Sequence, residues 1–269
     1  MRPYSQLRRH VSLLAAYFAQ YAKVRIGYRA DFFITLGTSF AATVFSLAFV
    51  YILFGRIPAL ATWPKYQVFF LYGFSLIPFG LFNVLSLNLY EFGSAYVMEG
   101  KFDRVLLRPV SSLFQVLFET FRIESLQEVA TGLVIVIWSG HKLGYRWNAL
   151  DVLLLALFAL CGGVIYISVF LFLSTLSFWF EDRVGVHPPF WNLLAFGRYP
   201  LSIYSGYIQF LLSWIIPFGF ATFYPGARLL GRAEFRAYAP LVPLVAAASL
   251  GLAAASWRVG VRRYASTGS

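Results

Sequence analysis

The sequence predicts an all-α membrane protein with six transmembrane helices in one domain. Of its 269 residues, 59% are hydrophobic and only 12% are charged, whereas soluble domains carry about 25% charged residues. The uncharged stretches are also long, since residues 152–180 contain no charge at all. A chain of this size cannot bury so much apolar surface in water, so we expect a lipid bilayer around it.

Charge and cysteine content exclude several other classes. The net charge is +11, but the basic residues lie at the ends of apolar stretches and do not gather on one polar face. We therefore expect membrane lipid as their partner, and no nucleic acid. The single cysteine, Cys161, lies within an apolar stretch, which excludes a disulfide framework and a thiol metal site.

Residues 1–30 are expected to form an N-terminal interfacial segment. Within it, residues 4 to about 22 have the pattern of an amphipathic helix lying on the membrane. An apolar stripe with basic residues beside it defines this helix: Leu7, Val11, Leu14 and Phe18, with Arg8 and Arg9. The alternative is an irregular basic leader.

The transmembrane domain is expected over residues 31–263, followed by a short tail at 264–269. At about 20 residues per crossing, the uncharged stretches each predict one span: residues 32–54, 66–90, 152–180, 199–227 and 237–257. A remaining span is centred on the wholly apolar residues 129–138. We extend it back to about Val116, which places four charged side chains inside or beside the bilayer: Glu119, Arg122, Glu124 and Glu128.

Polar groups inside these spans have two interpretations. Glu119 and Arg122 can pair locally, and Glu128 can pair with polar groups of a neighbouring helix. Alternatively, Glu124 or Glu128 lines an opening for an amphiphilic cation. In the second span, Asn83 and Asn88 either line a translocation path or form hydrogen bonds between helices.

The fifth span is expected to be broken near its outer end. Prolines and glycines at Pro217, Gly219, Pro225 and Gly226 interrupt it, and broken backbone at membrane depth needs protein or a water-filled cavity around it. We predict that residues from about 218 to 238 return into the outer leaflet as short helices. A kinked helix with a surface loop is the alternative.

The distribution of basic residues predicts that both termini are cytoplasmic. In this orientation the inner segments hold fourteen basic residues: Arg2, Arg8, Arg9, Lys23, Arg25, Arg29, Lys101, Arg104, Arg108, Arg183, Arg198, Arg258, Arg262 and Arg263. The outer segments hold seven: Arg56, Lys65, Lys142, Arg146, Arg228, Arg232 and Arg236. This excess on the inner side follows the positive-inside rule.

The segment 99–110, between the second and third spans, combines charge, an apolar face and helix breakers. Gly100 and Pro109 bracket about two helical turns. Phe102, Val105 or Leu106, and Pro109 share one face, and Arg104 and Arg108 lie four residues apart on another. This pattern predicts a short helix at the membrane surface that presses against another protein. An ordinary basic cytoplasmic loop is the alternative.

The run Gly-Lys-Phe-Asp-Arg-Val-Leu-Leu-Arg-Pro at 100–109 resembles the signature of ABC type-2 permeases, the transmembrane subunits of ATP-driven exporters. A second similarity lies nearer the C-terminus, in Tyr-Pro-Leu-Ser-Ile-Tyr at 199–204, Ile-Pro-Phe at 216–218, Tyr-Pro at 224–225 and Leu-Leu-Gly at 229–231. These resemble the family's fifth helix and the re-entrant turn that follows it. With the six-span layout, the resemblance covers most of the chain.

The resemblance implies a type-2 ABC exporter fold in a bacterial inner membrane. It also implies two permease chains, identical or related sisters, and two copies of a separate ABC ATPase. The segment 99–110 would be the coupling helix that contacts this ATPase, through residues including Gly100, Phe102, Asp103, Arg104, Leu106, Leu107, Arg108 and Pro109.

The chain itself is not expected to be an enzyme. It contains no Gly-x-x-x-x-Gly-Lys-Ser/Thr loop for phosphates, so ATP and Mg²⁺ are expected on the partner ATPase and no cofactor on this chain. The three histidines lie on separate segments, which argues against a metal site. Three other functions stay open: an ATP-independent secondary transporter or channel, a membrane enzyme acting on lipid, and a structural scaffold.

Overall fold

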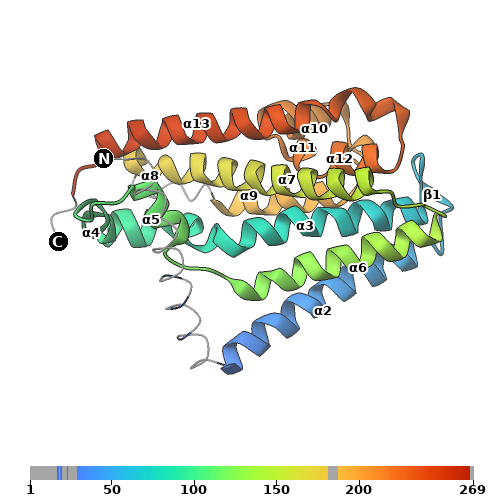
Figure 1. Cartoon of the computed structure of the whole chain (residues 1–269), viewed down its shortest axis with the longest axis horizontal. Helices are drawn as coiled ribbons and strands as arrows, with labels where there is room; N and C mark the ends of the chain where they lie inside the picture. Colours follow the sequence, from blue (N-terminus) through green and yellow to red (C-terminus); the bar gives the residue numbers. More distant parts are fainter. Residues whose placement is uncertain (1–16, 18, 20–22, 24–28, 181–186, 267–269) are drawn as a thin grey trace.

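The structure is a computed structural model that describes residues 17, 19, 23, 29–180 and 187–266. Long helices run side by side along one axis (Figure 1). The short helix α4 (Lys101–Leu106) and the last described residues lie at one end of this bundle, and the hairpin β1–β2 (Ala59–Leu60 and Trp63–Pro64) lies at the other. We call these the α4 end and the hairpin end. The amphipathic helix predicted at 4–22 falls almost wholly outside the described residues.

Several helical stretches are long and apolar enough to cross a membrane. In the described part of the chain there are four: 30–53, 65–85, 149–180 and 233–263. They correspond to α2 (Arg29–Leu53), to most of α3 (Lys65–Tyr90), to α7 (Ala149–Thr175) with α8 (Ser177–Phe180), and to α13 (Leu241–Arg263) with the residues before it. This supports a multi-pass membrane protein. Helix α13 runs past Trp257, where we predicted its end, as far as Arg263.

The predicted third span is shorter than we expected. Its helix, α6 (Leu126–Lys142), has 17 residues, about 25 Å at 1.5 Å per residue, and is not among the long apolar stretches. The prediction of one continuous helix from Val116 is wrong. The stretch 112–125 instead forms α5 (Ser112–Phe118), a turn and the 3₁₀ segment η2 (Ile123–Ser125).

The chain leaves the helix at 119–122 because polar groups there have partners elsewhere. Glu119 lies 3.5 Å from the Lys101 ammonium, so the predicted local pairing of Glu119 with Arg122 is also wrong. The backbone N–H of Arg122 donates to the Val84 carbonyl of α3 at 3.0 Å. Together these contacts hold the turn against α3 and α4.

Helix α3 is the centre of the bundle and packs closely against both α6 and α7. Glycines allow this approach. A Cβ atom placed on Gly132 of α6 would lie 2.6 Å from the Gly73 carbonyl oxygen, and one on Gly80 would lie 2.9 Å from the Ser125 carbonyl oxygen. Small residues are typical where membrane helices meet, because they let the backbones approach.

The fifth span is broken, as predicted. The segments α10 (Gly206–Phe210) and η5 (Leu211–Ile215) are followed by α11 (Phe218–Ala221) and α12 (Phe223–Leu229) at a bend of 73°. Pro217 lies at the break, where it has no N–H to donate. Residues 218–227 are all buried, so protein surrounds the broken backbone, as it must at membrane depth.

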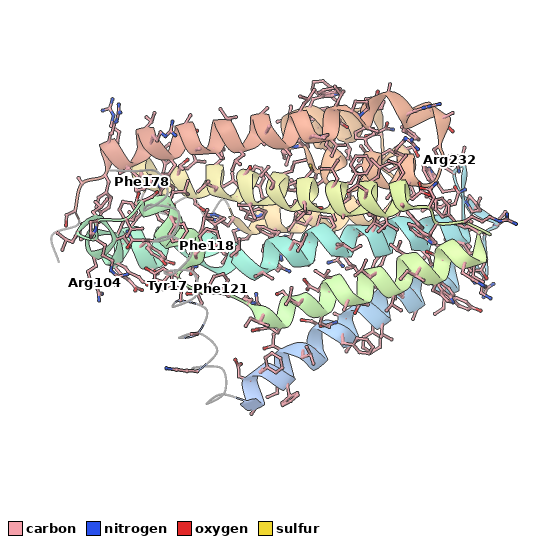
Figure 2. All side chains as sticks on the ribbon, viewed as in Figure 1. Tyr17, Arg104, Phe118, Phe121, Phe178 and Arg232 are labelled. Atoms are coloured by element: carbon pink, nitrogen blue, oxygen red, sulfur yellow. The ribbon has the colours of Figure 1, made fainter. Side chains whose placement is uncertain are left out.

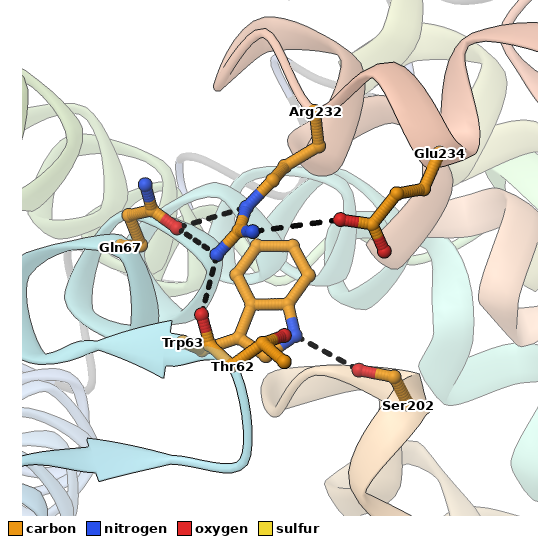
Figure 3. Close-up of polar contacts among 6 residues, drawn as sticks. All are labelled: Thr62, Trp63, Gln67, Ser202, Arg232 and Glu234. Atoms are coloured by element: carbon orange, nitrogen blue, oxygen red, sulfur yellow. Dashed lines mark hydrogen bonds and ion pairs between the residues drawn. The ribbon is translucent and has the colours of Figure 1, made fainter.

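Arg232 fastens this broken region to the hairpin β1–β2 (Figure 3). Its guanidinium donates to the Gln67 side-chain oxygen at 2.7 and 3.1 Å and to the Thr62 carbonyl at 2.6 Å. It also lies 4.3 Å from the ring centre of Trp63, and Trp63 donates to Ser202 Oγ at 2.8 Å. The segment η6 (Ala233–Tyr238) follows Arg232, so the chain beyond the break is tied to the hairpin end.

The remaining short elements connect these parts. They are the π-helical turn η1 (Phe92–Met98), α9 (His187–Leu193), η3 (Leu194–Arg198) and η4 (Leu201–Ile203). Helix α2 stands apart on one side of the bundle (Figure 1), and large apolar side chains cover its surface: Phe33, Ile34, Phe45, Phe49 and Ile52 are each more than 60% exposed. Such a surface is stable only against lipid or another apolar chain.

The close approach of α3 and α6 gives a testable prediction. Gly132→Ala forces these helices apart, and we expect it to lower the free energy of unfolding by about 1–3 kcal/mol, the usual cost of overpacking. The control is Gly251→Ala on α13, where a Cβ atom meets nothing within 4 Å. It should be neutral, or stabilise the helix by up to about 1 kcal/mol. Thermal unfolding in detergent measures both, and equal effects of the two variants would contradict the packing argument.

Candidate functional site

Helix α4 forms where the sequence predicts a short bracketed helix. Gly100 precedes it in the left-handed conformation, with φ of 70°, and the helix runs from Lys101 to Leu106. Gly100 takes this conformation without the steric cost that a Cβ atom brings. Pro109 cannot continue a helix, and the chain turns before it reaches α5.

One face of α4 is buried in an aromatic cluster. Phe102 is completely buried and Val105 is 3% exposed. The Phe102 ring meets four other rings edge to face, at centroid distances of 5.0–5.9 Å: Phe92, Phe178, Trp257 and Tyr264. These rings come from η1, α8, α13 and the residue after α13. We call these five residues the Phe102 cluster; it attaches α4 to the ends of three membrane-crossing segments.

This burial corrects one prediction. Phe102 was expected to offer apolar contact to a partner, but its side chain does not reach the surface. Its spacing with Val105 on the helix marks the face that packs inward. Phe102 therefore supports α4 from within, and the outward contacts belong to other residues.

The opposite face of α4 is open. Leu106 is 44% exposed and Leu107 84% exposed, and Arg104, Arg108 and Pro109 are exposed beside them. Figure 2 shows Arg104 at the α4 end of the molecule, far from Arg232. Within the described residues neither Arg104 nor Arg108 forms an ion pair. Two leucines between two unpaired arginines form a small surface suited to a protein partner.

Two polar side chains, Gln115 and Asp103, hold α4 in place. Gln115 of α5 is buried, and its amide nitrogen donates to the Val105 and Val110 carbonyls at 3.0 Å each. Asp103 accepts a hydrogen bond from the Ser266 hydroxyl at 2.7 Å. Burial and the nearby Asp103 carboxylate raise the pKa of Tyr264 to about 12, so this hydroxyl is neutral at physiological pH. Asp103, predicted as a partner contact, thus also fastens the C-terminal residues to α4.

A third contact joins α4 to the turn after α5. Tyr96 donates to Glu119 Oε2 at 2.5 Å, and the Lys101 ammonium lies 3.5 Å from the same carboxylate oxygen. Lys101 also lies 4.4 Å from the centre of the Tyr96 ring. Burial, and then the hydrogen bond to Glu119, raise the pKa of Tyr96 far above its ordinary value. Tyr96 therefore stays a hydrogen-bond donor at any physiological pH.

From this turn, hydrogen bonds lead into α3. Asn88 donates to the Thr120 carbonyl at 3.2 Å, and Asn83 donates to Glu128 of α6 at 2.9 Å. Asn83, Asn88 and Glu124 are each only 4% exposed. Both asparagines thus form hydrogen bonds between segments of the chain. Glu128 pairs with a polar group of a neighbouring helix, which is one of the two interpretations given in the sequence analysis. A role of Asn83, Asn88, Glu124 and Glu128 in lining a path stays a prediction.

The ends of α7 and α9 are joined to α3 in the same region. The Ser174 hydroxyl donates to the Leu89 carbonyl or the Phe170 carbonyl, each at 2.8 Å, and lies 3.2 Å from His187 Nε2. His187 is 3% exposed, and no cluster of metal-ligating side chains occurs in the part of the chain that the structure describes. This histidine is a structural contact between helices.

An apolar groove of about 640 Å³ opens beside the broken fifth span. Phe172 of α7, Trp214 of η5 and Leu252 of α13 contribute to its walls. Three serines also line it, and two of them, Ser168 and Ser213, donate to carbonyls four residues earlier; the third is Ser249. The other lining residues are apolar, so in a bilayer the groove can hold a hydrocarbon chain.

Comparison with known protein families identifies the family of this chain. The model of the ABC-2 family transporter protein matches residues 40–268, which includes α4 and the broken fifth span. The chain belongs to this family. Neither a curated protein nor a solved structure matches it. It is a membrane-spanning ABC transporter permease, and permeases of this family are transport components without catalytic activity of their own.

Several residues that support α4 in this permease were not predicted from the sequence. Tyr96, Gln115 and Trp257 each connect α4 or α5 to another segment, and they lie up to 145 residues from their partners along the chain. A buried glutamine in an apolar stretch is the one available signal, because such an amide needs partners. The identity of those partners depends on the fold.

On the two faces of α4, truncating a side chain should have different effects on the free energy of unfolding. Phe102→Ala removes the centre of the Phe102 cluster, and we expect it to reduce the free energy of unfolding by about 3–5 kcal/mol. Leu107→Ala removes an exposed side chain and should change it by less than about 0.5 kcal/mol. Thermal unfolding of the purified permease in detergent compares them. A destabilising Leu107→Ala, or a neutral Phe102→Ala, would reverse the assignment of the two faces.

Proposed function

We propose that this chain is the transmembrane subunit of an ATP-driven exporter in a bacterial inner membrane. It acts with a second permease chain, identical or related, and with two copies of a separate ABC ATPase that bind ATP and Mg²⁺. Helix α4 is the coupling helix, and both termini are cytoplasmic. The observation that carries this proposal is the exposed face of α4 mounted on the buried Phe102 cluster.

The geometry of α4 suits the transmission of force. A partner that moves the exposed face displaces Phe102, whose ring packs against η1 after α3, α8 after α7, and the end of α13. Packed interiors are dense and transmit displacement. Closure of the ATPases would therefore reach three spans through one side chain.

The need for a second permease chain follows from the filled interior. Large side chains such as Phe70, Phe74, Phe82 and Phe170 are completely buried between the helices, so the centre of one chain leaves no room for a path. The exposed apolar surface of α2 offers area for lipid and for a second chain. A path between two chains fits both features.

Six crossings per chain also belong to this proposal. Helix α6 with η2 extends over residues 123–142, 20 residues or about 30 Å, which equals the thickness of the hydrocarbon core. Glu128 can enter the bilayer there because it pairs with Asn83. If α6 is counted as a crossing, the number of crossings is even, and the described part of the chain begins and finishes at the α4 end.

Reversal of the charges on α4 tests the proposal. In the Arg104→Glu/Arg108→Glu variant, the amount of ABC ATPase that co-purifies with the permease should fall at least about tenfold, because like charges across an interface cost several kcal/mol. The ATPase is the one that co-purifies with the unaltered chain from its own membranes and carries a phosphate-binding loop. It is then co-expressed with each variant.

The matched control is Lys142→Glu/Arg146→Glu, which makes the same change of charge with the same spacing at exposed positions of the hairpin end. It should retain the ATPase in full. Equal recovery from both variants would remove α4 as the coupling helix. Cargo movement driven by an ion gradient in vesicles without any ATPase would instead identify a secondary transporter.

A further inference from the structure

A pocket of about 380 Å³ lies at the α4 end, between the end of α13 and the residues that enter α5. It is separate from the exposed face of α4, since neither Arg104 nor Leu107 lines it. Arg258 and Arg262 contribute its charge, and Ser111 and Ser112 face them from the other wall. Among the residues that the structure describes, no acidic side chain lines it.

The two arginines lie close together on one helix. They lie four residues apart on α13, so they project from the same face of the helix. Among the residues that the structure describes, neither forms an ion pair. Like charges at this spacing repel each other, and an anion between them would remove the repulsion.

The serine hydroxyl groups opposite the arginines are available as donors. Trp257 Nε1 donates to Ser112 Oγ at 3.2 Å, which occupies a lone pair of that oxygen and leaves its hydrogen free. Ser111 precedes α5, but its side chain caps no backbone N–H. In the described part of the chain neither serine donates its hydroxyl hydrogen to a protein atom. Two guanidinium groups and two hydroxyl groups together match the oxygen atoms of a phosphate.

The position of the pocket along α13 favours a lipid over a soluble anion. Toward the middle of α13, Leu252 is 62% exposed, and Val259 next to Arg258 is 53% exposed. Exposed apolar side chains therefore reach the level of the arginines on this helix, which places the pocket where lipid headgroups meet the acyl chains. Leu113, Ala254 and Val261 also line the pocket, and they can contact the first carbons of an acyl chain.

We propose that this pocket binds the phosphate headgroup of an anionic phospholipid. Arg258 and Arg262 contact the phosphate oxygens, and Ser111 and Ser112 donate hydrogen bonds to them. The apolar residues beside them hold the glycerol and the start of an acyl chain. This assignment does not rest on the proposed coupling to an ATPase, and it concerns a different face of the molecule.

Native mass spectrometry of the full chain in detergent tests the assignment, with phosphatidylglycerol as the probe. We expect phosphatidylglycerol to bind more tightly than phosphatidylcholine, whose headgroup has no net charge. In the Arg258→Gln/Arg262→Gln variant the dissociation constant of phosphatidylglycerol should rise about tenfold or more, in line with the loss of two basic side chains near a lipid phosphate. Both side chains are exposed, so the unfolding temperature in detergent with phosphatidylcholine should not fall.

The matched control compares Arg262→Gln with Arg263→Gln. These residues are adjacent, both are exposed and the change of charge is the same, but Arg263 does not line the pocket. Weaker binding in Arg262→Gln alone supports the pocket. Equal weakening in both variants would show diffuse attraction and overturn the proposal, and so would equal affinity for the two lipids. Displacement of phosphatidylglycerol by millimolar inorganic phosphate would show that the pocket takes a free anion and overturn the lipid assignment.

Discussion

The packing of one ring, Phe102, is the contact on which the rest of the structure depends. It meets four aromatic rings edge to face, and these rings stand at the ends of chain segments that are far apart in sequence. Edge-to-face contacts have preferred geometries, so α4 has a defined position relative to three spans. A helix of six residues has little stability of its own. Its shape and its place come from this cluster and from Gln115.

The two ends of the molecule are built differently. At the α4 end, aromatic rings pack in the Phe102 cluster, and separate polar contacts lie beside it, such as those of Tyr96, Glu119 and Lys101. At the hairpin end, Arg232 combines charge, four polar contacts and a ring contact in one place. Arg232 is half-buried and its ion-pair partner Glu234 is exposed, so the hydrogen bonds to Gln67 and Thr62 and the contact with Trp63 supply most of this attachment. They tie the chain beyond the break at Pro217 to the hairpin end.

The sequence predicted the parts of this fold that depend on local chemistry. Uncharged stretches identified α2, α3, α7 and α13, and Pro217 identified the break in the fifth span, because neither signal needs a partner. The prediction of the third span was wrong for the opposite reason. Glu119 leaves the helix to meet Lys101 and Tyr96, and such partners are set by tertiary contact. The prediction for Phe102 was wrong for the same reason. An apolar residue on a short surface helix can face inward or outward, and only the fold decides which.

Trp257 connects the proposed coupling helix with the proposed lipid pocket. The centre of its ring lies 5.9 Å from that of Phe102, and its indole nitrogen donates to Ser112, which lines the pocket of Arg258 and Arg262. Because Trp257 is 3% exposed, it cannot shift toward one neighbour without leaving a gap at the other. An anion that draws Ser112 and the arginines together would thus also fix the ring that supports α4. On this geometry, the proposed lipid at the membrane surface and the proposed coupling helix would be linked through a single buried side chain.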